Sequence, residues 1–228
     1  QEAKKAIDNL INLGCTLQET REILTHEIDW RIKCGARIIV STPREDIGAS
    51  MLIAEDLSPK VDVPVEVVPM EELEKVLSNS SNGTIVTSRY FLQPLEKVAK
   101  QHGVRAIAVD LSDFQKELKI LKELSAGSCV GIVSISPGLL RAAEVIIHSM
   151  RGSDLMLMTA ISDNNSRLLS LLKTSNHIVC DWPSLSVVEN TLLKNRSQLI
   201  RLPQIICAKN YLSIETINQL KKEIGVIN

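Results

Sequence analysis

The sequence predicts an α/β protein built from two similar parallel-sheet lobes in tandem, preceded by an α-helical hairpin. In the stretch 83–113, short apolar runs flank a helix with Pro94 in its first turn and Gly103 after its end, which is the pattern of a βαβ unit. The same pattern returns without a gap at 177–202, and Thr84 aligns with His177 at an offset of 177 − 84 = 93 residues.

The same offset relates further strands of the two halves. It aligns Ile39-Val40-Ser41 with Ile132-Val133-Ser134, residues 65–68 with 158–161, and Ala106-Ile107 with Leu199-Ile200. We therefore divide the chain into a helical dimerisation segment (1–34), a first α/β lobe (35–126) and a second α/β lobe with a C-terminal helix (127–228). Ligands of parallel sheets bind outside the carboxyl ends of the strands, so two facing lobes would form one cleft.

The helical segment carries an apolar stripe on each of two helices. Ala3, Ile7, Leu10 and Ile11 line the first, and Thr16 with Glu19 forms a capping box for the second. The second stripe consists of Leu17, Leu24, Ile28 and Ile32. A pair this short is marginal alone, so the stripe must be buried either on the chain's own α/β body or on a second subunit.

Strands and helices alternate through both lobes. In the first lobe we expect strands at 37–40, 63–68, 85–86 and 106–109, helices after the first three, and a last helix capped by Ser112. In the second we expect strands at 129–135, 155–161, 178–179 and 199–200, a further short strand at 205–207, helices after each of the first three, and a last helix capped by Ser213.

Composition excludes several classes of function. The net charge of −1 offers no polycation to nucleic acid, and no apolar run approaches the roughly 20 residues that span a bilayer. The five cysteines are odd in number and lack CxxC spacing, so we expect a reducing, cytoplasmic setting. The sequence shows no signal peptide and begins without Met, so we expect it to be part of a longer protein.

Polar groups recur in the loops that follow the strands. They are Ser41, Thr42, Arg44, Ser88, Arg89, Ser134, Ser136 and Asp181. Hydroxyls at helix N-termini with two arginines suit a small anionic ligand, because arginine binds carboxylates and phosphates bidentately. The alternative is ordinary N-capping, which places the same residue types at the start of helices.

Motifs for metals and catalysis are missing. The four histidines are scattered outside HExxH or Cys–His spacing, and neither GxSxG nor a nucleotide-binding glycine pattern occurs. We expect no cofactor, no metal and no enzymatic activity. Trp30, next to Asp29 and Arg31 in the second helix, suggests an interface, and Trp182 follows a strand-end Asp where it could line a pocket.

Residues 2–30, EAKKAIDNLINLGCTLQETREILTHEIDW, resemble the helical tail of YtrA-type GntR transcription regulators. The resemblance implies that this tail forms a homodimer and that DNA is bound only through a winged-helix domain that is absent here. Residues 36–57 and 83–99 resemble a cyanobacterial branch of the family that carries a long α/β extension. For that branch the resemblance implies nitrogen signalling with the PipX–PII complex as a protein partner.

Together these observations predict the effector-sensing and dimerisation part of a GntR-type regulator. The pairing surface would include Leu24, Ile28, Trp30 and Ile32. Two alternatives remain: an enzyme that acts on a small anionic substrate in the inter-lobe cleft, and a non-catalytic scaffold that docks other proteins.

Overall fold

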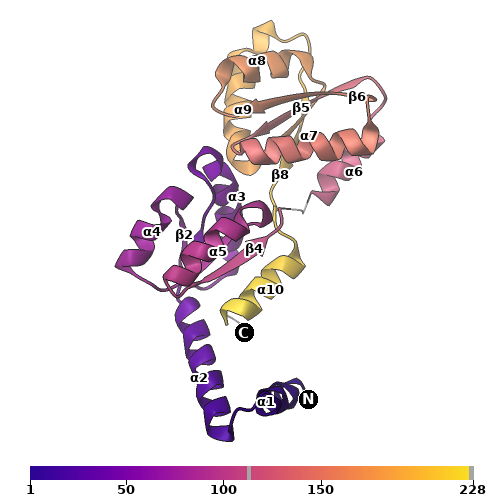
Figure 1. Cartoon of the computed structure of the whole chain (residues 1–228). Helices are drawn as coiled ribbons and strands as arrows, with labels where there is room; N and C mark the ends of the chain where they lie inside the picture. The colour runs from indigo at the N-terminus through magenta and orange to yellow at the C-terminus, as the bar shows by residue number, and fades with distance from the viewer. Residues whose placement is uncertain (112–113, 226–228) are drawn as a thin grey trace.

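The computed structural model, which describes residues 1–111 and 114–225, contains two four-stranded parallel sheets preceded by two helices (Figure 1). The hairpin and first lobe consist of α1 (Glu2–Asn12), α2 (Leu17–Cys34), β1 (Ile38–Val40), α3 (Ile47–Leu57), β2 (Val65–Val67), α4 (Met70–Asn79), β3 (Thr84–Ser88), α5 (Leu92–Gln101) and β4 (Arg105–Val109). The second lobe and its flanking helices are α6 (Gln115–Glu123), β5 (Ser128–Ser134), α7 (Pro137–Arg151), β6 (Leu155–Ile161), α8 (Asn165–Thr174), β7 (His177–Asp181), α9 (Trp182–Lys194), β8 (Gln204–Ala208) and α10 (Ile214–Ile224).

The two sheets have the same strand order, which confirms the predicted fold class. The orders are β2-β1-β3-β4 and β6-β5-β7-β8, with every pair parallel. The order of the strands reverses between β1 and β3 in the first sheet and between β5 and β7 in the second. Such a topological switch point is where α/β proteins bind ligands.

The predicted offset of 93 residues is correct for only one strand pair. Thr84 and His177, which are 93 residues apart, lie opposite Ile38 and Val130, so β1 and β5 correspond at 130 − 38 = 92. Val65 and Leu157 correspond at 157 − 65 = 92 in the same way. A slip of one residue reverses the side of the sheet that a side chain faces.

Packing shows the reversal. Ile39 packs with α4 and α5. Its equivalent at an offset of 92 is Gly131, which lies against Leu171 of α8. The predicted Ile132 instead packs on the other side of the sheet, with Leu121 of α6 and Leu140 of α7.

The alignment of Ala106-Ile107 with Leu199-Ile200 is wrong. β4 and β8 correspond at 204 − 105 = 99 residues, because the connection after α9 is six residues longer than the one after α5. Ile200 lies in that connection, fully exposed to solvent, and the last strand contains the predicted 205–207 instead.

Each lobe is covered by a helix from the other half of the chain. Leu118 and Leu121 of α6 pack on β5 of the second lobe, although α6 follows the last strand of the first. Ile217, Leu220 and Ile224 of α10 pack on β1 and β3 of the first lobe, although α10 follows the last strand of the second. The predicted boundary at residue 126 lies between the last strand of the first sheet and the first strand of the second, whereas α6 and α10 each cover the sheet on the other side of it. The predicted division into domains stays a prediction. The predicted cap Ser112 lies outside the described residues.

Candidate functional site

The carboxyl ends of the strands meet where the two lobes touch. Asp46, which follows β1, accepts hydrogen bonds from Ser136 Oγ at 2.7 Å and from the Gly138 amide at 3.2 Å. Ser136 is the N-cap of α7 in the second lobe, and its hydroxyl accepts from the Leu139 amide. The buried Asp46 carboxylate thus lies at the positive N-terminal end of a helix in the other lobe.

Two glycines allow this close approach. A Cβ atom on Gly48 would lie 2.1 Å from the carbonyl oxygen of Ile135, and one on Gly138 would lie 2.2 Å from Oδ2 of Asp46. At Gly48 the backbones of the two lobes are packed too tightly for any side chain, and at Gly138 the Asp46 carboxylate occupies the space, so the lobes are docked directly against each other.

The predicted hydroxyls of the first lobe are buried at its switch point. Thr42 Oγ1 donates to the Asp46 carbonyl oxygen and lies 2.8 Å from Ser50 Oγ, so it stabilises the turn into α3. Ser41 and Ser88 are also buried, and their hydroxyls have no hydrogen-bond partner among the residues that the structure describes. The predicted ligand-binding role of these residues stays a prediction.

The two predicted arginines are paired with carboxylates of the same lobe. Arg44 forms an ion pair with Glu72, and its backbone amide donates to Glu71. Arg89 donates two hydrogen bonds to Asp110, of 3.0 and 2.6 Å. A ligand that used either guanidinium as a clamp would first have to displace its carboxylate.

The Arg89–Asp110 pair gives a testable pH effect. The hydrogen bond from Arg89 lowers the pKa of the Asp110 carboxyl. A carboxyl group with a lowered pKa in the folded state stabilises the fold at pH values above its ordinary pKa. This stability is lost as the pH falls through the lowered pKa. In Arg89→Gln we expect the pKa of Asp110 to rise toward its ordinary value, as read by an NMR titration. Arg44→Gln is the control; an unchanged Asp110 pKa in Arg89→Gln would contradict the pairing.

In the second lobe the predicted residues act within the fold. Ser134 Oγ accepts from the Ser136 amide at 3.0 Å. Asp181 accepts from the Ser184 amide as the N-cap of α9 and also from the Ile135 amide, both at 2.9 Å. N-capping, the alternative considered above, therefore describes the bonds of Ser136 and Asp181.

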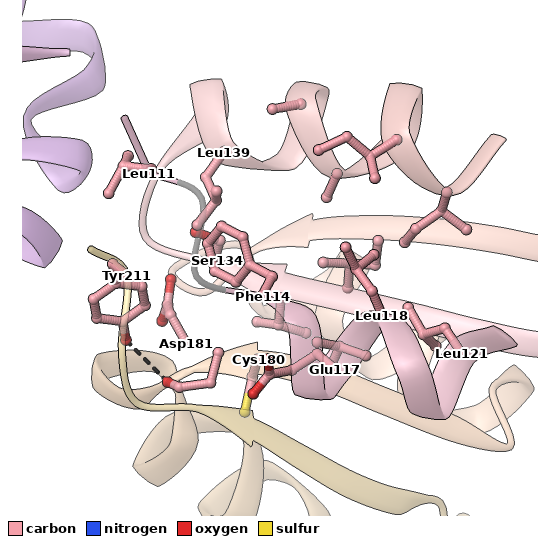
Figure 2. Close-up of a pocket in the computed structure, with 18 residues that line it drawn as sticks. Leu111, Phe114, Glu117, Leu118, Leu121, Ser134, Leu139, Cys180, Asp181 and Tyr211 are labelled. Carbon is pink, nitrogen blue, oxygen red and sulfur yellow. Dashed lines mark hydrogen bonds between the residues drawn. The ribbon is translucent and has the colours of Figure 1, made fainter. Parts of the chain in front are cut away.

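A pocket lies beside these strand ends, beneath α6 and α7 (Figure 2). Its walls are aliphatic, and its volume is about 80 Å³. An unfilled apolar cavity of that size would cost about 2 kcal/mol, at roughly 24 cal/mol per Å³. Polar groups occur mainly at the end formed by Ser134, Asp181 and Glu117.

Tyr211 closes the pocket at the junction of the lobes. Its hydroxyl donates to the Ala208 carbonyl oxygen at 3.0 Å and accepts from the Trp182 amide at 2.9 Å. Its ring meets that of Phe114 edge-on at 6.3 Å. Burial raises the pKa of the Tyr211 phenol, so this donor stays protonated at neutral pH.

The sequence did not single out Asp46, Glu117 or Tyr211 as site residues. Asp46 precedes α3, but its side chain makes no cap bond to its own helix. Asp56 accepts from the amides of Tyr211 and Leu212, which fixes the start of α10 to α3. The contacts of Asp46 and Asp56 join residues 90 or more positions apart, so no local sequence pattern indicates them.

The helical hairpin extends away from both sheets (Figure 1). Ile28 is 56% exposed and Ile32 68%, and Leu24 is only partly buried. Burial of this stripe on the chain's own body, one of the two alternatives, is thus not what the structure shows.

Trp30 instead contacts the first lobe. Its indole N–H donates to the Gly103 carbonyl oxygen at 2.6 Å, and the Arg105 guanidinium lies 6.0 Å from its ring centre. Trp182, predicted to line a pocket, is 45% exposed, with Lys209 Nζ 4.5 Å from its ring centre.

Within residues 1–111 and 114–225, no three or more His, Cys, Asp or Glu side chains are grouped to hold a metal ion. None of the helices in the same part of the chain has the length and apolar character needed to cross a membrane.

Comparison with known families identifies the class of domain. Residues 116–209 match a family model for the C-terminal domain of a GntR-type transcription regulator. The model is that of the cyanobacterial PlmA-type GntR regulators, which confirms the resemblance drawn from the sequence. The matched segment begins within α6 and ends just after β8, so it spans the second lobe with the α6 that covers it, without α10.

Among curated proteins nothing matches the chain. A solved structure titled "Complex structure of VinN with L-aspartate" is 12% identical, with a TM-score of 0.31. The alignment covers 91% of this chain and 67% of that one. A likeness this weak carries no argument about function.

Proposed function

We propose that this chain is the signal-receiving and dimerising part of a GntR-type transcription regulator. The observation that carries the proposal is the exposed apolar stripe of α2 on a hairpin whose base is fixed to the α/β body. In such a regulator DNA binding belongs to a winged-helix domain, and the net charge of −1 of this chain offers no polycation to nucleic acid.

The base of the hairpin is held rigidly. Besides the Trp30 contact, a Cβ atom on Gly35 would lie 2.4 Å from the carbonyl oxygen of Ile224, so α2 ends directly against α10. Arg105 connects the two helices further, because it lies over Trp30 and also forms an ion pair with Glu223 of α10 at 2.9 Å. Movement of α10 would therefore change the direction of the hairpin.

The same helix begins at the pocket. Tyr211 closes the pocket, and α10 starts three residues later. A ligand or protein partner that prefers one placement of the two lobes would shift α10, and with it the paired hairpins. This connection supports a binding role rather than catalysis, as does the use of the strand-end groups for contacts within the chain.

The finer parts of the proposal come from the resemblance to PlmA-type regulators. We propose a cytoplasmic homodimer in nitrogen signalling, with the PipX–PII complex as its protein partner.

Sedimentation of the unaltered chain tests the pairing. We expect a dimer at micromolar concentration, because Ile28 and Ile32 of the hairpin stripe are exposed to solvent in the single chain. A compact monomer over the whole concentration range would overturn the proposal.

A further inference from the structure

The pocket in Figure 2 has walls that suit an alkyl group. Leu118 and Leu121 of α6 line it, and they share one apolar cluster with the other lining residues Ala143 and Ile147 of α7 and Val179 of β7. Its volume of about 80 Å³ corresponds to roughly three water-sized groups of about 30 Å³ each. A chain of three or four carbon atoms would fill it.

One end of the pocket is acidic. Figure 2 shows Glu117 extending from α6 toward Cys180, and Glu117 has no hydrogen-bond or ion-pair partner within the described chain. Asp181, 3% exposed, accepts two amide hydrogen bonds, which leaves acceptor sites on its two oxygens. No arginine, lysine or histidine is among the residues that line the pocket.

The charges around this end favour a cation. Burial raises the pKa of Glu55, and the nearby carboxylates of Asp181 and Asp56 raise it further, so the electrostatic potential at the junction is negative. Lys209, which follows the pocket residue Ala208, has its ammonium group over the ring of Trp182. The Phe114 and Tyr211 rings close the same end, and aromatic faces attract cations.

We propose that this pocket binds a small protonated amine with a short alkyl group. The alkyl group lies between α6 and α7, and the ammonium group donates to Glu117 and Asp181. This ligand class differs from the anionic ligand that the strand-end arginines suggested, because an anion would meet two carboxylates and no basic side chain.

Such a ligand would touch both connections between the lobes. Leu111 and Phe114 belong to the first connection and Tyr211 to the second, and all three line the pocket. The regulatory effect of this ligand rests on the proposed function, whereas the binding of the amine to the pocket does not.

Methyl NMR titration of the full chain tests the proposal with three isosteric probes. We expect butylammonium to shift the methyl signals of Leu118 and Ala143, 1-butanol to bind at least tenfold more weakly, and butyrate not to bind. Glu117→Gln should weaken the binding of butylammonium about tenfold. Glu123→Gln, which changes an exposed residue of the same helix, should leave the affinity for butylammonium unaltered. Ala143→Leu should fill the pocket and abolish binding.

Equal affinity for butylammonium and 1-butanol would overturn the proposal, because the carboxylates would then play no part. No binding of any probe, with a higher melting temperature for Ala143→Leu, would also overturn it and identify the pocket as a packing defect. Either result leaves the sedimentation behaviour of the chain unaffected, so a failure here is distinguishable from a failure of the proposed function.

Discussion

Replacing Leu24, Ile28 and Ile32 together with serine is expected to convert the dimer into a folded monomer. Full burial of one such side chain contributes about 1.5–3 kcal/mol. A symmetric dimer would lose six of them, which is about 9 kcal/mol even at the lower value. A micromolar dimer has a binding free energy of only about 8 kcal/mol. Sedimentation velocity measures the change in mass, and far-UV circular dichroism shows whether the helices persist.

A matched control lies on the opposite side of the same helix. Glu22, His26 and Lys33 are exposed, and changing all three to serine introduces the same number of serines without touching the apolar stripe. This variant should remain dimeric. A triple variant at Leu24, Ile28 and Ile32 that stays dimeric would locate the pairing surface elsewhere, and one that unfolds would show that the stripe belongs to the core of the chain.

Gly48→Ala is expected to force the two lobes apart. The added carbon would lie 2.1 Å from the Ile135 carbonyl oxygen, and backbone on both sides leaves no flexible side chain to move. Overpacking of this kind costs about 1–3 kcal/mol, and separation would also break the bonds of Asp46 to Ser136 and Gly138. We expect a larger radius of gyration in small-angle scattering and a lower melting temperature.

Two further variants distinguish a loss of contact between the lobes from strain within one lobe. Gly131→Ala would place a carbon 2.3 Å from Leu171 inside the second lobe, so it should lower the melting temperature without expanding the molecule. Gly138→Ala clashes with the Asp46 side chain, so adding Asp46→Ala should recover part of the loss. An unchanged radius of gyration in Gly48→Ala would show that the lobes tolerate a wider spacing without separating.

The fold class followed from the sequence because apolar periodicity reports strands and helices directly. The stretch Leu155–Ile161 became β6 with the expected bounds, and Thr84 and His177 open equivalent strands. The register of β1 against β5 was missed by one residue, since runs of Ile and Val align equally well at 92 or 93. The stripe of Leu118 and Leu121 showed that α6 is buried, but amphipathic spacing cannot say on which sheet.

The candidate site was less predictable. Arg44 and Arg89 stand at strand ends as expected, but their carboxylate partners come from α4 and from the residue after β4. Whether an arginine is available to a ligand depends on such tertiary partners. The pocket is formed by residues of β5, β7, β8, α6 and α7, so no single stretch of sequence carries its signal.

The positions of α6 and α10 bear on how the protein is made. During synthesis the first sheet leaves the ribosome long before residues 214–224, yet these residues cover the side of that sheet formed by Ile38, Val40 and Val86. The sheet emerges first but is completed last, because α3 covers only part of this apolar side and the part under α10 stays exposed to chaperones and to neighbouring nascent chains until translation ends. A cut between the lobes would leave both products in that incomplete condition, so the two lobes are expected to be inherited, expressed and degraded as one unit.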